Sequence, residues 1–309
     1  MAKDQPPVAL IAGPTASGKS ELGLRIAEAT GGAIVNADSA QIYRDLPILS
    51  AVPSSADLAR AEHRLYGVRD GAAACSAADW AALAKAEIAS LHEESRLPIL
   101  VGGTGLYLRT LLDGIAPVPS IDPSVRADVR AASVAENLAA LVPLDPVAAA
   151  TLNPGDTTRI ARALEVVKST GRPLADWQKQ LQGGIGNCIE LRPLILLPPR
   201  PWLNERCDRR FAAMMENGAV TEVEKLLERK LDPQLPVMRA IGVREITAFL
   251  DGELTKAQAI DAGQQATRRY AKRQYTWFSH QPPADWRRFT DPLDGQAIDR
   301  ALALLRPAE

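Results

Sequence analysis

The sequence predicts an α/β fold in which helices flank a parallel β-sheet and an all-helical domain is inserted into the core. Three observations lead to this prediction. Short apolar runs alternate with helical stretches over the first third of the chain, which is typical of a parallel sheet. A middle block shows helical periodicity alone. After that block, a glycine-rich stretch leads into another apolar run, which indicates a return to the sheet.

The elements of the first part of the core can be justified in order. Bounded apolar runs predict buried strands, and they lie at residues 8–13, 32–38 and 97–103. A helix is expected over 19–30, because Gly31 supplies a typical stop signal. Another helix is expected to begin after Ser76, whose spacing from Asp79 is that of a capping box.

The middle and the last part of the chain complete the plan. Residues 122–182 are helical in pattern, with Gly171 as a stop, and prolines at 117–123 and glycines at 182–187 bracket them. We expect a strand over 188–199 and helices after it. The predicted domains are therefore a first core segment, a helical insertion, and a second core segment ending in a basic helix, at 1–117, 118–187 and 188–309.

Composition excludes several classes of protein. The 309 residues are 46% hydrophobic and 24% charged with a net charge of −1, as in a globular protein without a global excess of basic charge. The apolar run near the N-terminus is too short for a signal sequence or a membrane span, so we expect a cytoplasmic protein without membrane contact. The three cysteines and three histidines are scattered and show neither a disulfide framework nor zinc-ligand spacing.

The stretch "GPTASGKS" follows the first predicted strand and opens the first predicted helix. It matches the phosphate-binding pattern G-x-x-x-x-G-K-[ST], and its context is that of a P-loop NTPase-like core. Backbone N–H groups of such a loop face a phosphate, the lysine neutralises it and the hydroxyl holds Mg²⁺. The predicted phosphate-binding residues are Gly13, Pro14, Thr15, Ala16, Ser17, Gly18, Lys19 and Ser20, with Ser20 as the ligand of Mg²⁺.

Polar residues also follow the other two predicted strands of this part of the core. Asp38 ends the second strand and Thr104 follows the third. Each alone could serve structure, because Asp38 could cap a turn or hold Mg²⁺ and Thr104 could cap a helix. The carboxyl ends of parallel strands meet at one edge of a sheet, so together these residues predict a site that faces the phosphate loop.

Residues 262–281 combine basic and aromatic side chains and contain no acidic residue. On a helix, Arg269, Lys272, Arg273 and Thr276 are expected to share one face, because residues three and four apart are neighbours. Such a face suits RNA, in which phosphates bind cations and bases stack on aromatic rings. The alternative is a solvated basic face backed by aromatic core contacts.

These stretches resemble the bacterial tRNA dimethylallyltransferases, also called tRNA isopentenyltransferases or the IPP transferase family. The resemblance rests on "GPTASGKS", "NADSAQIY", "EHRLYGV", "CSAADW", "ILVGGTGLYLRTLLDG", "RIARALEV", "IGVREI" and "TRRYAKRQYTWF", which occur in this order from about residue 8 to about residue 280. It implies transfer of a dimethylallyl group from dimethylallyl diphosphate to N6 of the adenine on the 3′ side of the tRNA anticodon. The loop would then hold a diphosphate leaving group.

The resemblance also implies roles for individual residues. Asp38 is expected to accept the proton of the attacking amine, and Thr104 to bridge to a diphosphate oxygen at the same centre. Arg206, and with it Arg210, is expected to line the channel and bind diphosphate. We expect a monomer. The residues expected to contact tRNA are Asp38, Ser39, Ala40, Gln41, Thr104, Arg126, Thr158, Arg159, Ile160, Ala161, Arg162, Gly242, Arg244, Arg269, Lys272 and Arg273.

The chain departs from the family pattern in four places. A "GTAKP"-like stretch reads "LSAVP" at 49–53, so its lysine is missing, and the second histidine of "HHL" is Arg64. An "HPND"-like loop reads "NPGD" at 153–156, and the tyrosine of "GY" is Val243. Two other functions use the same loop: a small-molecule kinase that binds ATP, and an RNA-binding protein switched by a nucleotide. Only a transferase would move a dimethylallyl label into RNA.

Overall fold

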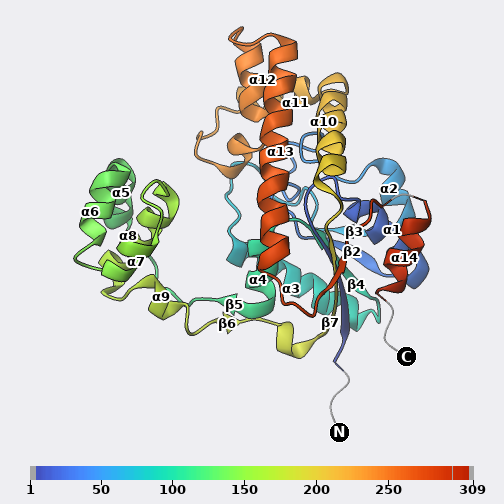
Figure 1. Ribbon diagram of the computed structural model, residues 1–309, viewed down its shortest axis with the longest axis horizontal. Helices are drawn as coiled ribbons and strands as arrows, with labels where there is room; N and C mark the ends of the chain where they lie inside the picture. Colours follow the sequence, from blue (N-terminus) through green and yellow to red (C-terminus); the bar gives the residue numbers. More distant parts are fainter. Residues whose placement is uncertain (1–4, 294, 306–309) are drawn as a thin grey trace. The chain divides into compact units, whose positions relative to one another are not determined.

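The structure is a computed structural model that describes residues 5–293 and 295–305 (Figure 1). The chain forms two compact units. One combines the chain up to Leu111 with the chain from Gly186 onward, and it contains the large sheet. The other, Leu112–Ile185, is mainly helical. The helical unit is therefore an insertion into the chain of the sheet unit.

Six parallel strands form the sheet, in the order β3-β2-β4-β1-β7-β8. Four of them lie where apolar runs predict strands, so the predicted α/β class is confirmed. The sequence does not predict β3 and β8, because these edge strands have only two and three residues and no apolar run. The bounds are β1 (Pro7–Ala12), β2 (Ala33–Asn36), β3 (His63–Arg64), β4 (Pro98–Gly102), β7 (Glu190–Leu196) and β8 (Arg287–Phe289).

Both faces of the sheet are covered. Side chains of β1, β2, β4 and β7 pack with α1 (Lys19–Thr30) and α14 (Gln296–Ala303) into one hydrophobic core. Alternate residues of β1, such as Leu10, point to the other face and are also buried. There α3 (Ala77–Glu93) packs against β2 and β4. With both faces filled, polar chemistry is left to the edge where the strands end.

The ends of several helices follow local signals in the sequence. Gly31 and Gly171 both end helices with a φ of 67°, a conformation that glycine adopts without strain. Ser76 and Asp79 form the expected capping box at the start of α3. A second capping box, Ser54 with Asp57, opens the short helix α2 (Ser55–Arg60). Helix α4 (Gly105–Asp113) leads into the inserted unit, which begins at Leu112.

A group of helices after β7 stands beyond the carboxyl edge of the sheet (Figure 1). Within it α10 packs along α13, and a Cβ at Gly263 would lie 2.0 Å from the Phe211 ring, so glycine permits this close approach. No helix in residues 5–293 and 295–305 has both the length and the hydropathy needed to cross a bilayer. The helices are α10 (Arg200–Glu216), α11 (Ala219–Glu228), α12 (Val243–Leu250) and α13 (Lys256–His280), with a 3₁₀ turn at Pro236–Arg239. Another 3₁₀ turn, Gly186–Cys188, precedes β7.

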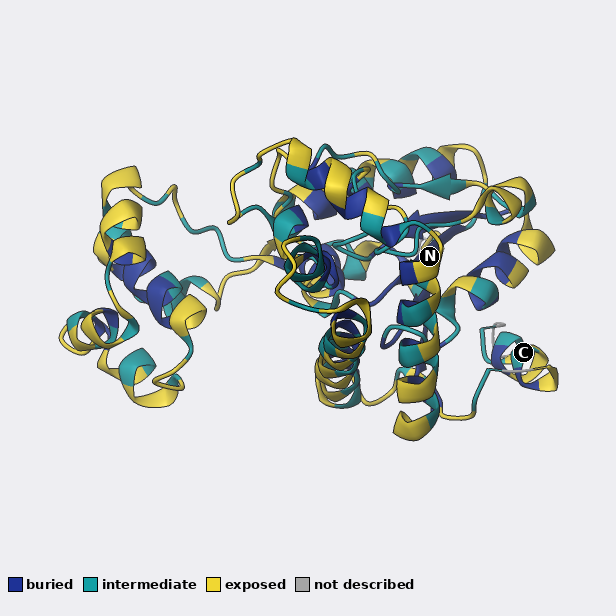
Figure 2. Cartoon of the chain, turned by 90° about the horizontal axis from the view of Figure 1, so that it is seen from above, coloured by how far each residue is buried: buried dark blue, intermediate teal, exposed yellow. Residues whose placement is uncertain are grey.

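The helical unit has its own hydrophobic core, formed around Ile160 and Leu164 of its longest helix. Its first and last strands pair with each other, Gly114 with Gly183 and Ile115 with Gln182, so they belong to this unit. The unit therefore begins at Leu112, before the predicted residue 118, and ends at Ile185, just before the predicted residue 187. Its elements are β5 (Gly114–Ile115), α5 (Pro123–Ala131), α6 (Val134–Leu141), α7 (Pro146–Thr151), α8 (Thr157–Thr170), α9 (Leu174–Trp177) and β6 (Gln182–Gly183). Figure 2 shows its buried residues on the inward sides of these helices.

Candidate functional site

The phosphate-binding pattern forms a loop between β1 and α1, as its spacing predicts. Gly13 and Gly18 have φ angles of 149° and 96°, and a Cβ on Gly13 would lie 2.4 Å from the carbonyl oxygen of Leu196. Ser17 is almost fully buried, and its Oγ has no hydrogen-bond partner within the described residues. An unpartnered buried hydroxyl costs stability unless a ligand engages it, so the loop is built to receive a polar group.

Lys19 lies at the first position of α1 with its side chain turned over the loop. Its Nζ donates to the carbonyl oxygen of Pro14 at 2.6 Å. Burial lowers the pKa of Lys19 to about 8, the nearby Asp38 carboxylate opposes this shift, and Arg210 adds to it. Loop, lysine and Asp38 therefore share one electrostatic environment.

Asp38 follows β2 and is held by a polar side chain inside the fold. Its N–H donates to Oδ1 of the buried Asn36 at 2.8 Å, and its own Oδ1 accepts from Ala40 N at 3.0 Å. Asn36 is fixed in turn, since Trp80 Nε1 donates to its carbonyl oxygen and its Nδ2 donates to Leu65 O. This network leaves Asp38 at the end of the strand, beside the phosphate loop.

Thr104 follows β4 and meets the segment that contains Asp38. Its N–H donates to Ala37 O at 3.3 Å, its Oγ1 accepts from Ser39 N at 2.9 Å, and it donates to Ser39 Oγ at 3.2 Å. A Cβ on Gly102 would lie 2.1 Å from Ala37 O, so glycine allows the two strand ends to approach. The sequence places Asp38 and Thr104 at neighbouring strand ends, and the structure brings them together.

Helix α13 supplies a residue that the sequence does not single out. Gln274 is buried, its Oε1 accepts from Thr15 N at 2.8 Å, and its Nε2 donates to Gly103 O at 2.8 Å. It thus ties the phosphate loop to the end of β4. The nearest sequence signal is its place within the basic, aromatic segment, but nothing there distinguishes it from its neighbours.

Two arginines of α10 reach the same loop. Arg206 Nε donates to Ala16 O at 2.9 Å, and its guanidinium stacks over Trp202 at 4.5 Å. Arg210 donates to the Thr15 hydroxyl, and burial lowers its pKa. The loop is therefore lined by three cations, since Lys19 joins the two arginines, which suits a ligand with more than one negative charge.

A cavity of about 300 Å³ opens from the loop toward the helices beyond the sheet. Tyr270 lines this cavity, and its pKa is raised mainly by burial and further by the charge of Asp38. The polar lining includes Thr15, Asp38, Ser39, Arg210, Tyr270 and Arg273. The apolar lining includes Leu46, Leu49, Phe211, Met214, Val237 and Ile241. The arrangement suits a ligand with an anionic head and an apolar remainder.

The basic residues Arg269, Lys272 and Arg273 of α13 are all exposed, as expected for a shared face, but they line two different hollows. Arg273 lines the cavity, and its guanidinium lies 5.6 Å from the Tyr270 ring. Arg269 and Lys272 line a separate groove of about 410 Å³ between α10 and α13. Two arginines, Arg200 and Arg268, line this groove too. We call it the α10–α13 groove.

Other residues expected to contact RNA have varied surroundings. Gln41 Nε2 donates to the carbonyl oxygens of Ser50 and Ala51, whereas Ala40 lines the cavity. Gly242 has a φ of 98° and opens α12, in which Arg244 is exposed. Val243, at a departure from the family pattern, is buried in the core.

In the helical unit, α8 carries five of the residues expected to contact RNA. Ile160 and Ala161 are buried in the hydrophobic core of the unit, so their side chains serve packing and do not face solvent. The exposed ones are Thr158 and Arg159, with Arg162 half-buried, and Arg126 of α5 is exposed as well. The departure "NPGD" ends in Asp156, which caps α8 by accepting from Arg159 N.

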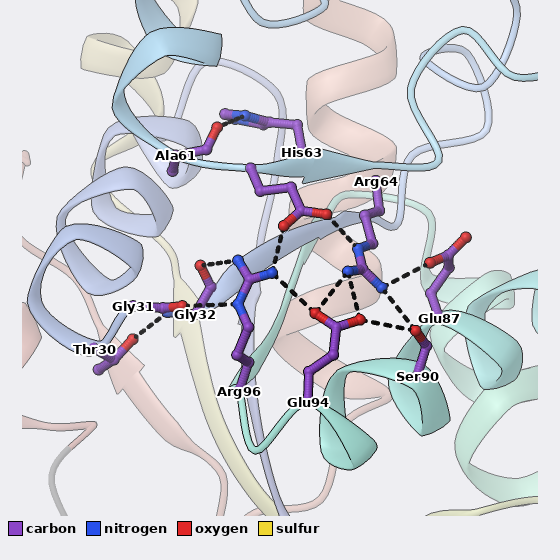
Figure 3. Close-up of polar contacts among 11 residues, drawn as sticks. Thr30, Gly31, Gly32, Ala61, His63, Arg64, Glu87, Ser90, Glu94 and Arg96 are labelled. Atoms are coloured by element: carbon purple, nitrogen blue, oxygen red, sulfur yellow. Dashed lines mark hydrogen bonds and ion pairs between the residues drawn. The ribbon is translucent and has the colours of Figure 1, made fainter.

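The departure at Arg64 has a structural explanation. Figure 3 shows Arg64 bound to Glu62, Glu87 and Glu94 while Arg96 bridges Glu62 and Glu94. Arg96 also donates to Gly31 O, just before β2, so the cluster joins the starts of neighbouring strands. Hydrogen bonds from Arg64, Ser90 and Arg96 hold the pKa of Glu94 at about 2. The cluster lies at the amino edge of the sheet, opposite the phosphate loop.

Comparisons with known proteins find a matching family model and similar chains. Residues 41–281 match the model of the IPP transferase family. The chain is 58% identical, over 97% of its length and 98% of the other protein, to the tRNA dimethylallyltransferase of Sphingopyxis alaskensis. It is 60% identical, over 88% of its length and 97% of the other, to the tRNA dimethylallyltransferase of Novosphingobium aromaticivorans.

Solved structures have the same fold. The full-length tRNA isopentenylpyrophosphate transferase of Bacillus halodurans superposes with a TM-score of 0.70 at 31% identity, covering 97% of this chain and 96% of that one. A eukaryotic dimethylallyltransferase described as acting on tRNA superposes with a TM-score of 0.77 at 27% identity, covering 88% of this chain and 70% of that one.

Proposed function

Because this chain belongs to the IPP transferase family, we propose that it transfers a dimethylallyl group from dimethylallyl diphosphate to tRNA. The acceptor is the exocyclic N6 of the adenine on the 3′ side of the anticodon. The observation that carries the proposal is the cavity, which joins a cation-lined phosphate loop to Asp38 and to apolar walls. The enzyme acts as a monomer in the cytoplasm.

In the proposed reaction, the bond between C1 of the donor and its diphosphate oxygen breaks and a bond between N6 and C1 forms. Asp38 accepts the proton that N6 loses, and diphosphate leaves with the electron pair of the broken bond. A positioned base contributes in this way where the amine alone is a poor nucleophile. When the donor is bound, the Thr104 O–H turns from Ser39 Oγ to a diphosphate oxygen beside the reacting carbon, while its oxygen still accepts from Ser39 N.

The phosphate loop stabilises the leaving group. Its backbone N–H groups and the Ser17 hydroxyl face the diphosphate, and Lys19 balances its charge. Arg206 and Arg210 add positive charge from α10. Fixed donors of this kind act where charge develops during the reaction, so they lower the barrier to bond breaking.

The residues around the loop fit a magnesium ion. Mg²⁺ is usually held by one or two protein oxygens together with substrate phosphates. The described part of the chain contains no group of three His, Cys, Asp or Glu side chains that could hold a metal ion. The hydroxyl of Ser20, exposed in the first turn of α1, would hold the ion, whose charge would help to balance the diphosphate.

The target adenine enters the cavity after leaving the anticodon loop, as enzymes that act on a base require. Asp38, Ser39 and Ala40 receive it, with Arg273 beside them. The α10–α13 groove binds backbone phosphates, which position RNA without reading its sequence. The exposed cations Arg126 and Arg159 and the half-buried Arg162 of the helical unit are further candidates for phosphate contacts, as is the exposed Arg244 of α12.

A labelling experiment tests the proposed function. The enzyme is mixed with tRNA and dimethylallyl diphosphate that is radiolabelled in its prenyl group. We expect the label to enter tRNA and to be recovered as N6-(dimethylallyl)adenosine after digestion. A kinase would instead move a phosphate from ATP and leave the RNA unlabelled. A protein that only binds RNA would retain tRNA but transfer nothing.

The salt dependence of tRNA binding tests the α10–α13 groove. Replacing Arg269 and Lys272 by glutamine is expected to weaken binding and to lower the slope of log Kd against log salt by about one for each lost phosphate contact. The control replaces Arg25 and Arg300 by glutamine, which changes the net charge equally on α1 and α14. An equal slope in both double variants would mean that the groove is only a solvated surface.

The lowered pKa of Lys19 predicts a pH dependence. Lys19 is charged below its pKa of about 8 and neutral above it, and only the charged form balances diphosphate. We therefore expect kcat/KM for the donor to fall as pH rises through about 8. Bound diphosphate stabilises the charged lysine and so raises its pKa in the complex. The fall of kcat with rising pH should therefore occur at a higher pH than the fall of kcat/KM. Profiles of kcat/KM and kcat with the same alkaline limb would contradict this assignment.

A further inference from the structure

One wall of the cavity is a tight turn that presents Leu49. The turn is closed by backbone hydrogen bonds, from Ser50 N to Leu46 O at 3.0 Å and from Val52 N to Pro47 O at 3.0 Å. Leu49 lines the cavity together with the apolar side chains Phe211 and Met214. The turn belongs to the stretch in which this chain departs from its family's sequence pattern.

A buried carboxylate holds this turn in place. Glu222 of α11 accepts from Ile48 N through Oε1 at 2.6 Å and from Leu49 N through Oε2 at 2.9 Å. It is only 8% exposed, and burial raises its pKa although the two N–H groups oppose the shift. The reaction proposed above does not use Glu222. Because it bonds the backbone of Leu49 itself, Glu222 fixes where that side chain enters the cavity.

The other side of the Leu49 side chain packs closely against Gly242. A Cβ on Gly242 would lie 2.7 Å from Leu49 Cδ2 and 3.1 Å from the Phe211 ring. Leu49 therefore occupies space that a larger residue at position 242 would fill. Gln41 anchors the far end of the turn by donating to Ser50 O and Ala51 O. The wall is consequently rigid, and its position is determined on both sides.

The size of the cavity makes this wall important. Its volume of about 300 Å³ is at the small end of the range for ligand pockets, and it must hold an adenine as well as the prenyl group. The phosphate loop holds the diphosphate and Asp38 holds N6 of the adenine. The prenyl chain must therefore lie against the apolar side chains of the cavity. We propose that Leu49, held by Glu222, sets the length of the prenyl chain that the site accepts. This inference rests on the proposed function.

The test compares two donors with the same tRNA: dimethylallyl diphosphate and geranyl diphosphate, which is longer by one isoprene unit. Shortening Leu49 opens the wall, so Leu49→Ala should raise the ratio of kcat/KM for the geranyl donor to that for the dimethylallyl donor at least about tenfold. Leu49→Val should give a smaller rise and keeps more of the packing. The matched control is Leu58→Ala, because Leu58 is 53% exposed on α2 and should leave the ratio unchanged.

Glu222→Gln tests the positioning role. An amide has only one acceptor oxygen, so one of the two backbone N–H groups loses its partner, and the ratio should rise less than in Leu49→Ala. Variants that transfer the dimethylallyl group with an unchanged donor ratio would overturn the inference. So would a raised KM for tRNA alone, since Leu49 would then contact the base. Wild-type enzyme that transfers no dimethylallyl group would instead overturn the proposed function.

Discussion

Lys19→Ala is expected to lower kcat/KM for dimethylallyl diphosphate by at least about 10²–10³-fold, the usual cost of removing one fixed donor from a site where charge develops. Lys19 is the cation that belongs to the loop pattern itself, with its Nζ 2.6 Å from Pro14 O. Arg206 and Arg210 remain nearby but bond to the loop from α10, so they cannot take its place. Steady-state kinetics with the donor as the varied substrate measure the effect.

The matched control is Lys225→Ala, which removes an exposed lysine on α11. We expect this control to keep wild-type kinetics, and both variants to unfold at similar temperatures. The KM for tRNA should be unchanged in Lys19→Ala, because the lysine serves the leaving group. A folded Lys19→Ala enzyme with wild-type kcat/KM for the donor would remove the loop from the mechanism.

The phosphate loop could be predicted because its conformation depends on a few neighbouring residues. Gly13 and Gly18 adopt positive φ angles, and the strand and helix on either side fix where the loop lies. The same holds for Asp38 and Thr104, since the end of a buried parallel strand marks the functional edge of a sheet. In these cases short-range sequence patterns determine the position of a side chain.

Gln274 and Glu222 could not be predicted, because their partners are far away in the sequence. Gln274 binds Thr15 and Gly103, which are 259 and 171 residues away. Glu222 binds a turn more than 170 residues before it. Periodicity indicates that both residues lie on helices, but it does not say which loops those helices meet.

The two surfaces of α13 illustrate the same limit. Residues four apart on a helix differ by about 40° in direction, so Arg269 and Arg273 are near neighbours on a helical wheel. In the structure the boundary between two hollows falls between these two exposed residues, and Arg273 reaches the cavity while Arg269 reaches the α10–α13 groove. The position of that boundary depends on how α10 packs against α13, which periodicity alone does not contain.

Asp38→Ala is expected to slow the chemical step by about 10²–10⁴-fold, the usual contribution of a general base. The affinity for the donor should stay nearly unchanged, because the loop residues and not Asp38 hold the diphosphate. Single-turnover rates with saturating tRNA and donor isolate the chemical step. The matched control is Asp285→Ala, a change at an exposed carboxylate outside the cavity, which should leave the rate unchanged.

Asp38→Asn separates the two roles open to this carboxylate. The amide still accepts a hydrogen bond from Ala40 N, so the local structure should persist, but it no longer accepts a proton. If Asp38 is the general base, the Asp38→Asn variant should stay slow at every magnesium concentration. If Asp38 is instead a ligand of Mg²⁺, the variant should need more magnesium and should recover its rate when magnesium is in excess. Single-turnover rates across a magnesium titration decide between the two, and full recovery would assign Asp38 to the metal and leave the amine without a base.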